Sequence, residues 1–111
     1  MATITQLLDV KDANGSPVLI IPFSNYVLSK SLAASVAESF TVPANGNYVV
    51  FSANTDFYAN DRAVATVPGD VTNGSASELN PTARACVPGS TISVIAPIAG
   101  IITAAFYSKT P

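Results

Sequence analysis

The chain has 111 residues, a formal net charge of −2, 49% apolar residues and only 11% charged residues. That length suits a single domain, and high hydrophobicity with little charge is the reverse of a disordered composition, so the chain is expected to fold. The five Lys and Arg residues are scattered along the sequence, whereas nucleic-acid binding requires clustered positive charge, so no nucleic-acid partner is expected.

The N-terminal part predicts an extended arm followed by a strand. Met1–Asp12 precedes the first strong strand pattern, and Asn14-Gly15 is typical of a tight turn because both residues tolerate positive φ. Val18–Phe23 is a short apolar run of the kind that forms a strand buried on both faces. We therefore expect residues 1–15 to form an N-terminal arm and first turn, and residues 16–111 to form the folded domain.

The next segment carries two patterns. Leu32, Val36 and Phe40 stand at helical spacing, so Ser31–Ser39 could form a short helix. Phe40 and Val42 alternate with polar residues, which indicates a strand with one buried face. The choice between helix and strand before Phe40 stays open at this point.

The rest of the chain predicts strands separated by turns. Tyr48–Ala53 is rich in aromatic and β-branched residues, which favours a central strand. Gly69–Thr82 is rich in Gly, Ser, Asn and Asp and is expected to be a loop. Apolar and polar residues alternate again in Ile92–Val94 and Ile102–Phe106. Several short strands of this kind predict an all-β fold, namely a single small β-sandwich or jelly-roll-like domain.

The residue types argue against catalysis. The chain has no histidine, which removes the commonest general base and metal ligand. Cys86 stands between apolar neighbours in a strand-like context, where a thiol acts as a small hydrophobic residue. The acidic residues, of which Asp56 and Asp61 lie close together, are typical of surfaces and turns. We therefore assign no catalytic, cofactor-binding or metal-binding residue and do not expect an enzyme.

Two features bear on location. Met1–Val10 lacks the basic start and the apolar run of a secretory signal. The apolar stretches Val18–Phe23 and Ile92–Phe106 are too short, or too interrupted by Pro97 and Gly100, to span a bilayer. Synthesis in a cytoplasm and no membrane partner are therefore expected.

The adjacent rings of Phe57 and Tyr58 supply a binding hypothesis. In a strand one of two neighbouring rings must face outward. Such a ring could anchor a protein partner or stack on a sugar. The alternative is that Phe57 belongs to the core and that Tyr58 is half exposed.

Several stretches of the sequence resemble small virion proteins of tailed phages. The resemblance covers roughly Phe23 to the C-terminus, and within that group the chain is most similar in size and composition to the capsid decoration (cement or staple) proteins of the epsilon-15 group of short-tailed phages. The stretches that carry it are AESFTVPA at Ala37–Ala44, NYVVFSA at Asn47–Ala53, DFY at Asp56–Tyr58, ASELNP at Ala76–Pro81, ISVIAP at Ile92–Pro97 and AAFY at Ala104–Tyr107.

This resemblance implies a β-sandwich or jelly roll on the outer surface of the phage capsid, where it would staple neighbouring major capsid subunits. The expected partners are then the major capsid protein and a second copy of the chain, as a homodimer, after synthesis in the host cytoplasm. A carbohydrate-binding β-sandwich on a phage tail or fibre is the alternative function, because Phe57 and Tyr58 could stack on a sugar.

Two regions are the expected protein contacts. The N-terminal segment Thr3–Val10 alternates enough to lie along a neighbour as an added strand. Asp56–Arg62 contains residue types that are favoured at interfaces. The predicted contact residues are Ile4, Leu7, Leu8, Phe57, Tyr58 and Arg62.

Overall fold

A computed structural model of the chain describes residues 8–11 and 17–109. Within this part of the chain the secondary structure consists of ten strands, and no helix is present. The strands are β1 (Leu8–Lys11), β2 (Pro17–Ile20), β3 (Val27–Leu32), β4 (Glu38–Thr41), β5 (Tyr48–Ala53), β6 (Tyr58–Asn60), β7 (Glu78–Leu79), β8 (Ala83–Ala85), β9 (Thr91–Ile95) and β10 (Gly100–Tyr107).

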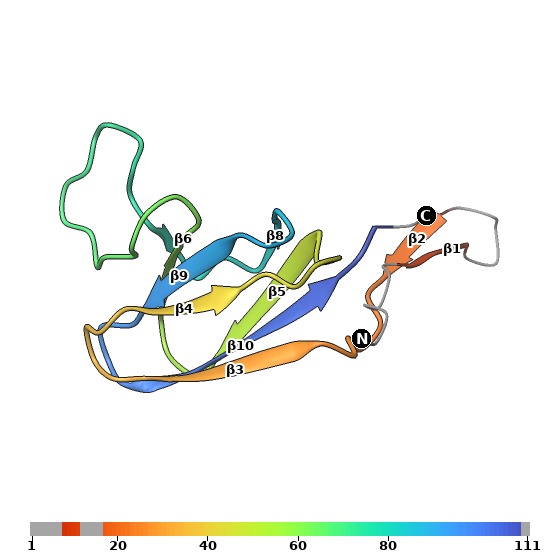
Figure 1. The fold of residues 1–111 in the computed structure, drawn as a ribbon, viewed down its shortest axis with the longest axis horizontal. Coiled ribbons are helices and arrows are strands. Elements are labelled where there is room, and N and C mark those ends of the chain that lie inside the picture. The colour runs from red at the N-terminus through yellow and green to blue at the C-terminus, as the bar shows by residue number, and fades with distance from the viewer. Residues whose placement is uncertain (1–7, 12–16, 110–111) are drawn as a thin grey trace.

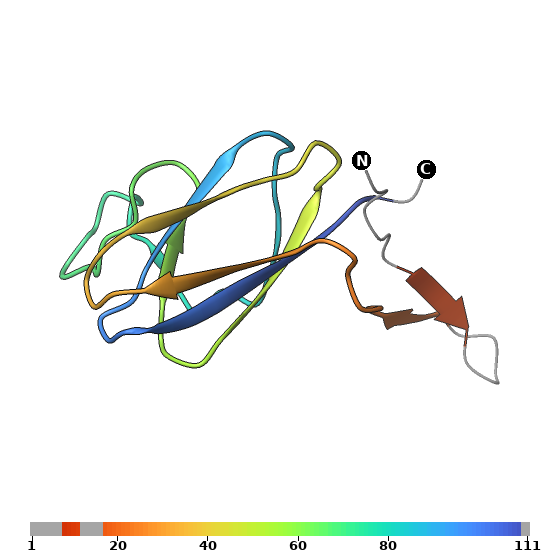
Figure 2. The same ribbon diagram turned by 60° about the horizontal axis from the view of Figure 1, so that its bottom comes forward.

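The strands form two antiparallel four-stranded sheets and a separate hairpin. The first sheet has the order β3-β10-β5-β8 and is called the β3 sheet; the second has the order β4-β9-β6-β7 and is called the β4 sheet. Figures 1 and 2 show the two sheets face to face, with the β1–β2 hairpin beyond one end of them. The predicted all-β sandwich is confirmed.

The strand pairs of the sandwich are nested. The first strand pairs with the last (β3 with β10), the second with the last but one (β4 with β9), and the inner strands follow the same rule (β5 with β8, β6 with β7). Such nesting describes one long antiparallel ribbon that has been rolled up. Rolling adds the pairs β5–β10 and β6–β9, which complete the two sheets. The connectivity is therefore that of a jelly roll.

The core follows from the alternation of side chains along the strands. In β10 the side chains of Ile102, Ala104 and Phe106 are buried, while the residues between them are more exposed. Successive side chains of a strand face opposite sides, so each strand contributes one row to the core and one row to the outer surface. The largest fully buried side chains are Phe40, Phe106, Ile102, Val42, Val49 and Val94.

The helical interpretation of Ser31–Ser39 is wrong. Leu32 is the last residue of β3 and Phe40 lies in β4, and both side chains are buried in the core. Val36 lies in the turn between the two strands and is exposed. The helical spacing therefore arose from two strands that contribute to one core, separated by a turn of suitable length.

The prediction that Val18–Phe23 forms one strand buried on both faces is also wrong for its last residues. β2 ends at Ile20, two residues before Pro22, which has no N–H to donate to a ladder. Ile21 and Phe23 are both exposed. β2 pairs with β1 and takes no place in either sheet of the sandwich.

The expected arm over residues 1–15 is described only in part. Residues 1–7 and 12–16 lie outside the described residues, and β1 pairs with β2 to form the hairpin. The boundary drawn at residue 16 therefore falls within this hairpin, and the strands of the sandwich begin at Val27.

A long loop joins β6 to β7. It covers residues 61–77, and the loop expected over Gly69–Thr82 overlaps it, although β7 lies within that range. Buried polar side chains hold the loop in place. Ser93 Oγ accepts a hydrogen bond from the Ala65 N–H (2.9 Å), and Asn60 Oδ1 accepts one from the N–H two residues further on (2.9 Å). The loop is therefore attached to the outer side of the β4 sheet.

Candidate functional site

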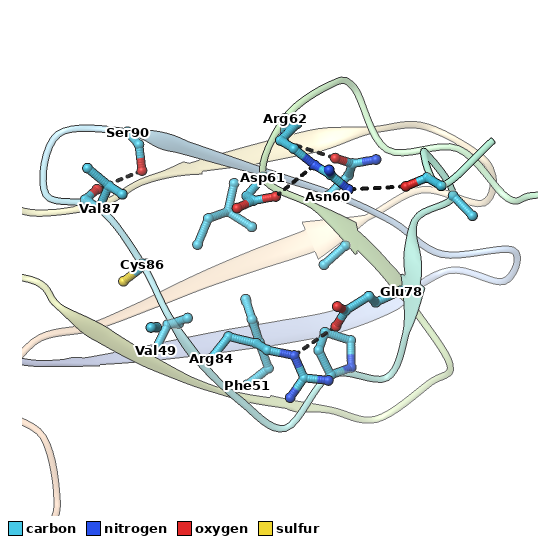
Figure 3. Close-up of a pocket in the computed structure, with 16 residues that line it drawn as sticks. Val49, Phe51, Asn60, Asp61, Arg62, Glu78, Arg84, Cys86, Val87 and Ser90 are labelled. Carbon is cyan, nitrogen blue, oxygen red and sulfur yellow. Dashed lines mark hydrogen bonds and ion pairs between the residues drawn. The ribbon is translucent and has the colours of Figure 1, made fainter.

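A groove opens between the two sheets along the side where the strands are shortest. It has a volume of about 340 Å³ and lies between β8 on one side and β6 and β7 on the other (Figure 3). β7 and β8 have two and three residues, so they cover only part of this edge of the sandwich. The core residues Val49, Phe51 and Ile92 form the apolar lining of the groove.

The charged side chains of the groove pair with one another. Arg84 Nε donates a hydrogen bond to Glu78 Oε2 (2.8 Å), and Arg62 Nε lies 3.7 Å from Asp61 Oδ1, as Figure 3 shows. Both pairs are exposed, so each contributes about 1 kcal/mol or less to stability. Each carboxylate that the described lining residues offer to the groove therefore lies beside an arginine.

Cys86 lies in the wall of the groove. Its side chain is half-buried, packs against the core, and its thiol lies 3.6 Å from the Gly46 carbonyl oxygen, to which it donates. Burial raises the pKa of the Cys86 thiol to about 11. The thiol is therefore neutral at physiological pH, and a neutral thiol is a poor nucleophile.

Residues 8–11 and 17–109 contain neither a metal-binding cluster nor a membrane-spanning helix. No group of three or more His, Cys, Asp and Glu side chains in this part of the chain could hold a metal ion. The same residues contain no helix that is long and apolar enough to cross a membrane. To a ligand, the groove offers an apolar lining and two pairs of charged side chains.

The structure does not bring the predicted contact residues of Asp56–Arg62 onto one surface. Phe57 is 3% exposed and packs in the core against Phe51, with the ring centroids 5.6 Å apart. Tyr58 is half-buried, and Arg62 is exposed at the groove. Of this set, Tyr58 and Arg62 are the residues that a partner can reach.

The other predicted contact residues are in the N-terminal segment. Ile4 and Leu7 lie outside the described residues. Leu8 is the first residue of β1, where its backbone is paired with Ile20 of β2. The role of this segment as an added strand stays a prediction.

Among the residues that the structure describes, none with a charged side chain points outward from the β3 sheet, and we call this side the uncharged face. Its membership follows from the register, because directly paired residues of neighbouring strands point to the same side of a sheet. Four rows cross the sheet: Tyr107, Tyr48 and Ala85; Val27, Ala105, Val50 and Ala83; Ser29, Thr103 and Ser52; Ser31 and Ile101. Apart from Tyr107, these side chains are exposed or half-buried.

The outer side of the β4 sheet differs, because the chain covers part of it. Ser93 of β9 and Asn60 of β6 are outward positions, yet both are buried. Ala65 of the β6–β7 loop lies over them and is 1% exposed. The molecule thus shields one of its two sheets with its own loop and leaves the neutral face of the other open.

Comparison with protein-family models, with curated proteins and with solved structures finds no match for this chain. The uncharged face is the site that reasoning from the sequence missed. Part of the signal is visible in the sequence, since the outward positions of Tyr48–Ala53 and Gly100–Tyr107 are all uncharged. The face also needs the outward residues of β3 (Val27–Leu32), a segment for which the sequence pattern predicts no strand.

Proposed function

We propose that the chain is a non-enzymatic structural protein of a phage virion, which binds the outer surface of the capsid and staples neighbouring major capsid subunits. The uncharged face carries this proposal. A protein that lies permanently on another protein needs a broad surface that loses its water without leaving a charge unpaired. Small neutral side chains, such as Ser29, Thr103 and Ala105, meet that requirement.

Other observations support the proposal. The sequence resembles phage decoration proteins, and the jelly-roll connectivity is one that viral capsid proteins share with lectins and cupins. A fold shared by so many functions does not select among them, so the argument depends on the surface. The paired charges of the groove and the neutral thiol of Cys86 give no support to an enzymatic function.

The test uses head particles of the phage that encodes this chain, prepared with its gene deleted, and purified chain added back. Ser52→Lys places a charge on the uncharged face, and Thr72→Lys places the same charge in the exposed β6–β7 loop. An unpaired buried charge is strongly unfavourable at an interface, so we expect Ser52→Lys to lower particle binding about 100-fold and Thr72→Lys to leave it unchanged. Full binding of Ser52→Lys, or no binding of the wild-type chain, would contradict the proposal.

The groove favours a second candidate function, the binding of a carbohydrate by a module on the tail or a fibre. Its volume of about 340 Å³ suits a small ligand, and Asp61, Glu78 and Arg84 offer hydrogen-bonding groups beside an apolar lining. Binding of immobilised glycans that is lost in Arg84→Ala, together with cryo-EM density for the chain on the tail, would favour this function over capsid stapling.

A further inference from the structure

Phe23 is the most exposed of the large apolar side chains that the structure describes. Its relative exposure is 101%, compared with 70% for Val64, the next in rank. It lies between β2 and β3, where the chain passes from the hairpin to the sandwich (Figure 2). A phenylalanine kept fully in water gains free energy when a partner covers it, and aromatic residues are prominent among the residues that dominate binding.

Both neighbours of Phe23 form hydrogen bonds with β10. The Tyr107 hydroxyl donates a hydrogen bond to the Pro22 carbonyl oxygen, and burial raises the pKa of Tyr107. On the other side, Ser24 Oγ donates to the Phe106 carbonyl (2.7 Å). Phe23 therefore stands between two hydrogen-bonded neighbours, so ordering the backbone of this segment in a complex costs little entropy.

The support of Phe23 lies at one end of the uncharged face. Tyr107 is an outward residue of β10, next to the inward Phe106, and it pairs with Tyr48 of the same face. Tyr107 is nevertheless only 3% exposed, and its hydroxyl bonds to Pro22. The segment that carries Phe23 thus lies against the Tyr107 end of the face, and Phe23 is the residue next to this contact.

We propose that Phe23 anchors the uncharged face to its partner by inserting into an apolar pocket of a capsid subunit. This inference rests on the proposed function and names the residue that dominates the contact. The partner is a protein surface without charged groups at the contact, because a charge buried against this face would meet no side chain of opposite charge there. An exposed aromatic side chain beside small neutral contacts is the type of residue that dominates binding at hot spots.

The experiment measures the binding of the full-length chain to head particles that lack it. Phe23→Ser is compared with the wild-type chain and with Val64→Ser, which alters the next most exposed of these apolar side chains, in the β6–β7 loop. We expect Phe23→Ser to bind about 30-fold more weakly, the size of a hot-spot loss, and Val64→Ser to bind like the wild type. Both side chains are exposed, and urea unfolding checks that both variants fold.

Two further variants separate the anchor from a general effect of the substitution. Phe23→Leu keeps an apolar side chain and should restore binding to within about threefold of the wild type. Tyr107→Phe removes only the hydroxyl that holds Pro22, and it should weaken binding about threefold, because Phe23 is then less firmly placed.

The outcomes distinguish the inference from the proposed function. If the wild-type chain binds and Phe23→Ser binds equally well, the anchor is overturned while the proposed function stands. If the wild-type chain does not bind the particles, both fail. If Phe23→Ser loses only self-association in analytical ultracentrifugation and binds particles normally, Phe23 belongs to a contact between copies of the chain, and the anchor on the capsid is overturned.

Discussion

Cys86 shows how the surroundings of one side chain decide its chemistry. It is the single cysteine of the chain, and it stands in a groove where solvent can reach it in part. Accessibility alone would make it a candidate nucleophile, yet burial raises the pKa of its thiol to about 11. The raised pKa favours the protonated form, so the reactive thiolate is scarce until the pH approaches that value.

Labelling of Cys86 with iodoacetamide tests this assignment. At pH 8 we expect the folded chain to react about 100-fold more slowly than the chain unfolded in urea, since the unfolded thiol has an ordinary pKa. The rate of the folded chain should then rise about tenfold per pH unit up to a pH of about 11. Equal rates for the folded and unfolded chains at pH 8 would show an ordinary thiol in the groove.

Gly100 is the residue where the fold leaves no room for a side chain. A Cβ added at this position would lie 2.7 Å from Asn54 Oδ1 and 2.9 Å from Thr55 Cβ. Asn54 Oδ1 cannot move away without losing the hydrogen bond that it accepts from the Ile101 N–H (2.8 Å). Gly100 begins β10, so the crowding falls at the start of the longest strand in the described part of the chain.

Gly100→Ala should therefore destabilise the chain by about 1–3 kcal/mol, the usual range for overpacking. Gly69→Ala is the matched control, because a Cβ at Gly69 meets nothing within 4 Å; its effect should stay within about 0.5 kcal/mol. The free energy of unfolding is measured by urea denaturation. Equal stabilities of the two variants would show that Asn54 and Thr55 make room at little cost.

At the scale of elements, the β6–β7 loop depends on hydrogen bonds to buried side chains. Ser93→Ala removes the acceptor of the Ala65 N–H, and Ala65 is 1% exposed, so that donor is left without a partner. An unsatisfied buried donor costs about 1–3 kcal/mol. We expect Ser93→Ala to lose stability by that amount and to be cleaved faster by proteases within residues 61–77.

Ser29→Ala is the control for this substitution, because Ser29 lies exposed in β3 on the other sheet. Its stability and its cleavage pattern should match those of the wild type. Mass spectrometry of the early fragments locates the cuts. Cleavage of Ser93→Ala at the same sites and rates as the wild type would mean that the loop is held by other contacts.

The sequence predicts those strands that have one buried and one exposed face. Ile102–Phe106 lies in β10, because alternation reports directly on a half-buried strand, and Tyr48–Ala53, predicted from its aromatic and β-branched residues, is β5. β7 and β8 have two and three residues, too few for any period to emerge. β3 shows no clear alternation, because a charged residue interrupts its inward-facing side chains. Lys30 is the inward residue next to Leu32, and at the edge of the sheet its Nζ lies 4.0 Å from Glu38 Oε1.

The candidate surfaces belong to the scale of the whole molecule. The uncharged face combines outward residues of four strands between Val27 and Tyr107, and only the nested pairing of the jelly roll brings them together. No pattern within a short stretch of sequence shows which residues of these distant strands lie opposite one another. The sequence correctly predicts the all-β class. The burial of Phe57 in the core and the exposure of Phe23 to solvent depend on how the strands pair and pack, which the local sequence does not specify.

The absence of charge from this face leads to a prediction for the whole particle. If the uncharged face and Phe23 make the contact, binding of the chain to head particles should change less than about threefold between about 0.05 M and about 0.5 M NaCl, because salt screens only charged groups. A contact through the groove would involve Asp61, Arg62, Glu78 and Arg84, and its affinity should depend on salt. Sedimentation of particles with bound chain across this range measures the effect. Strong weakening at high salt would move the contact from the uncharged face to the groove.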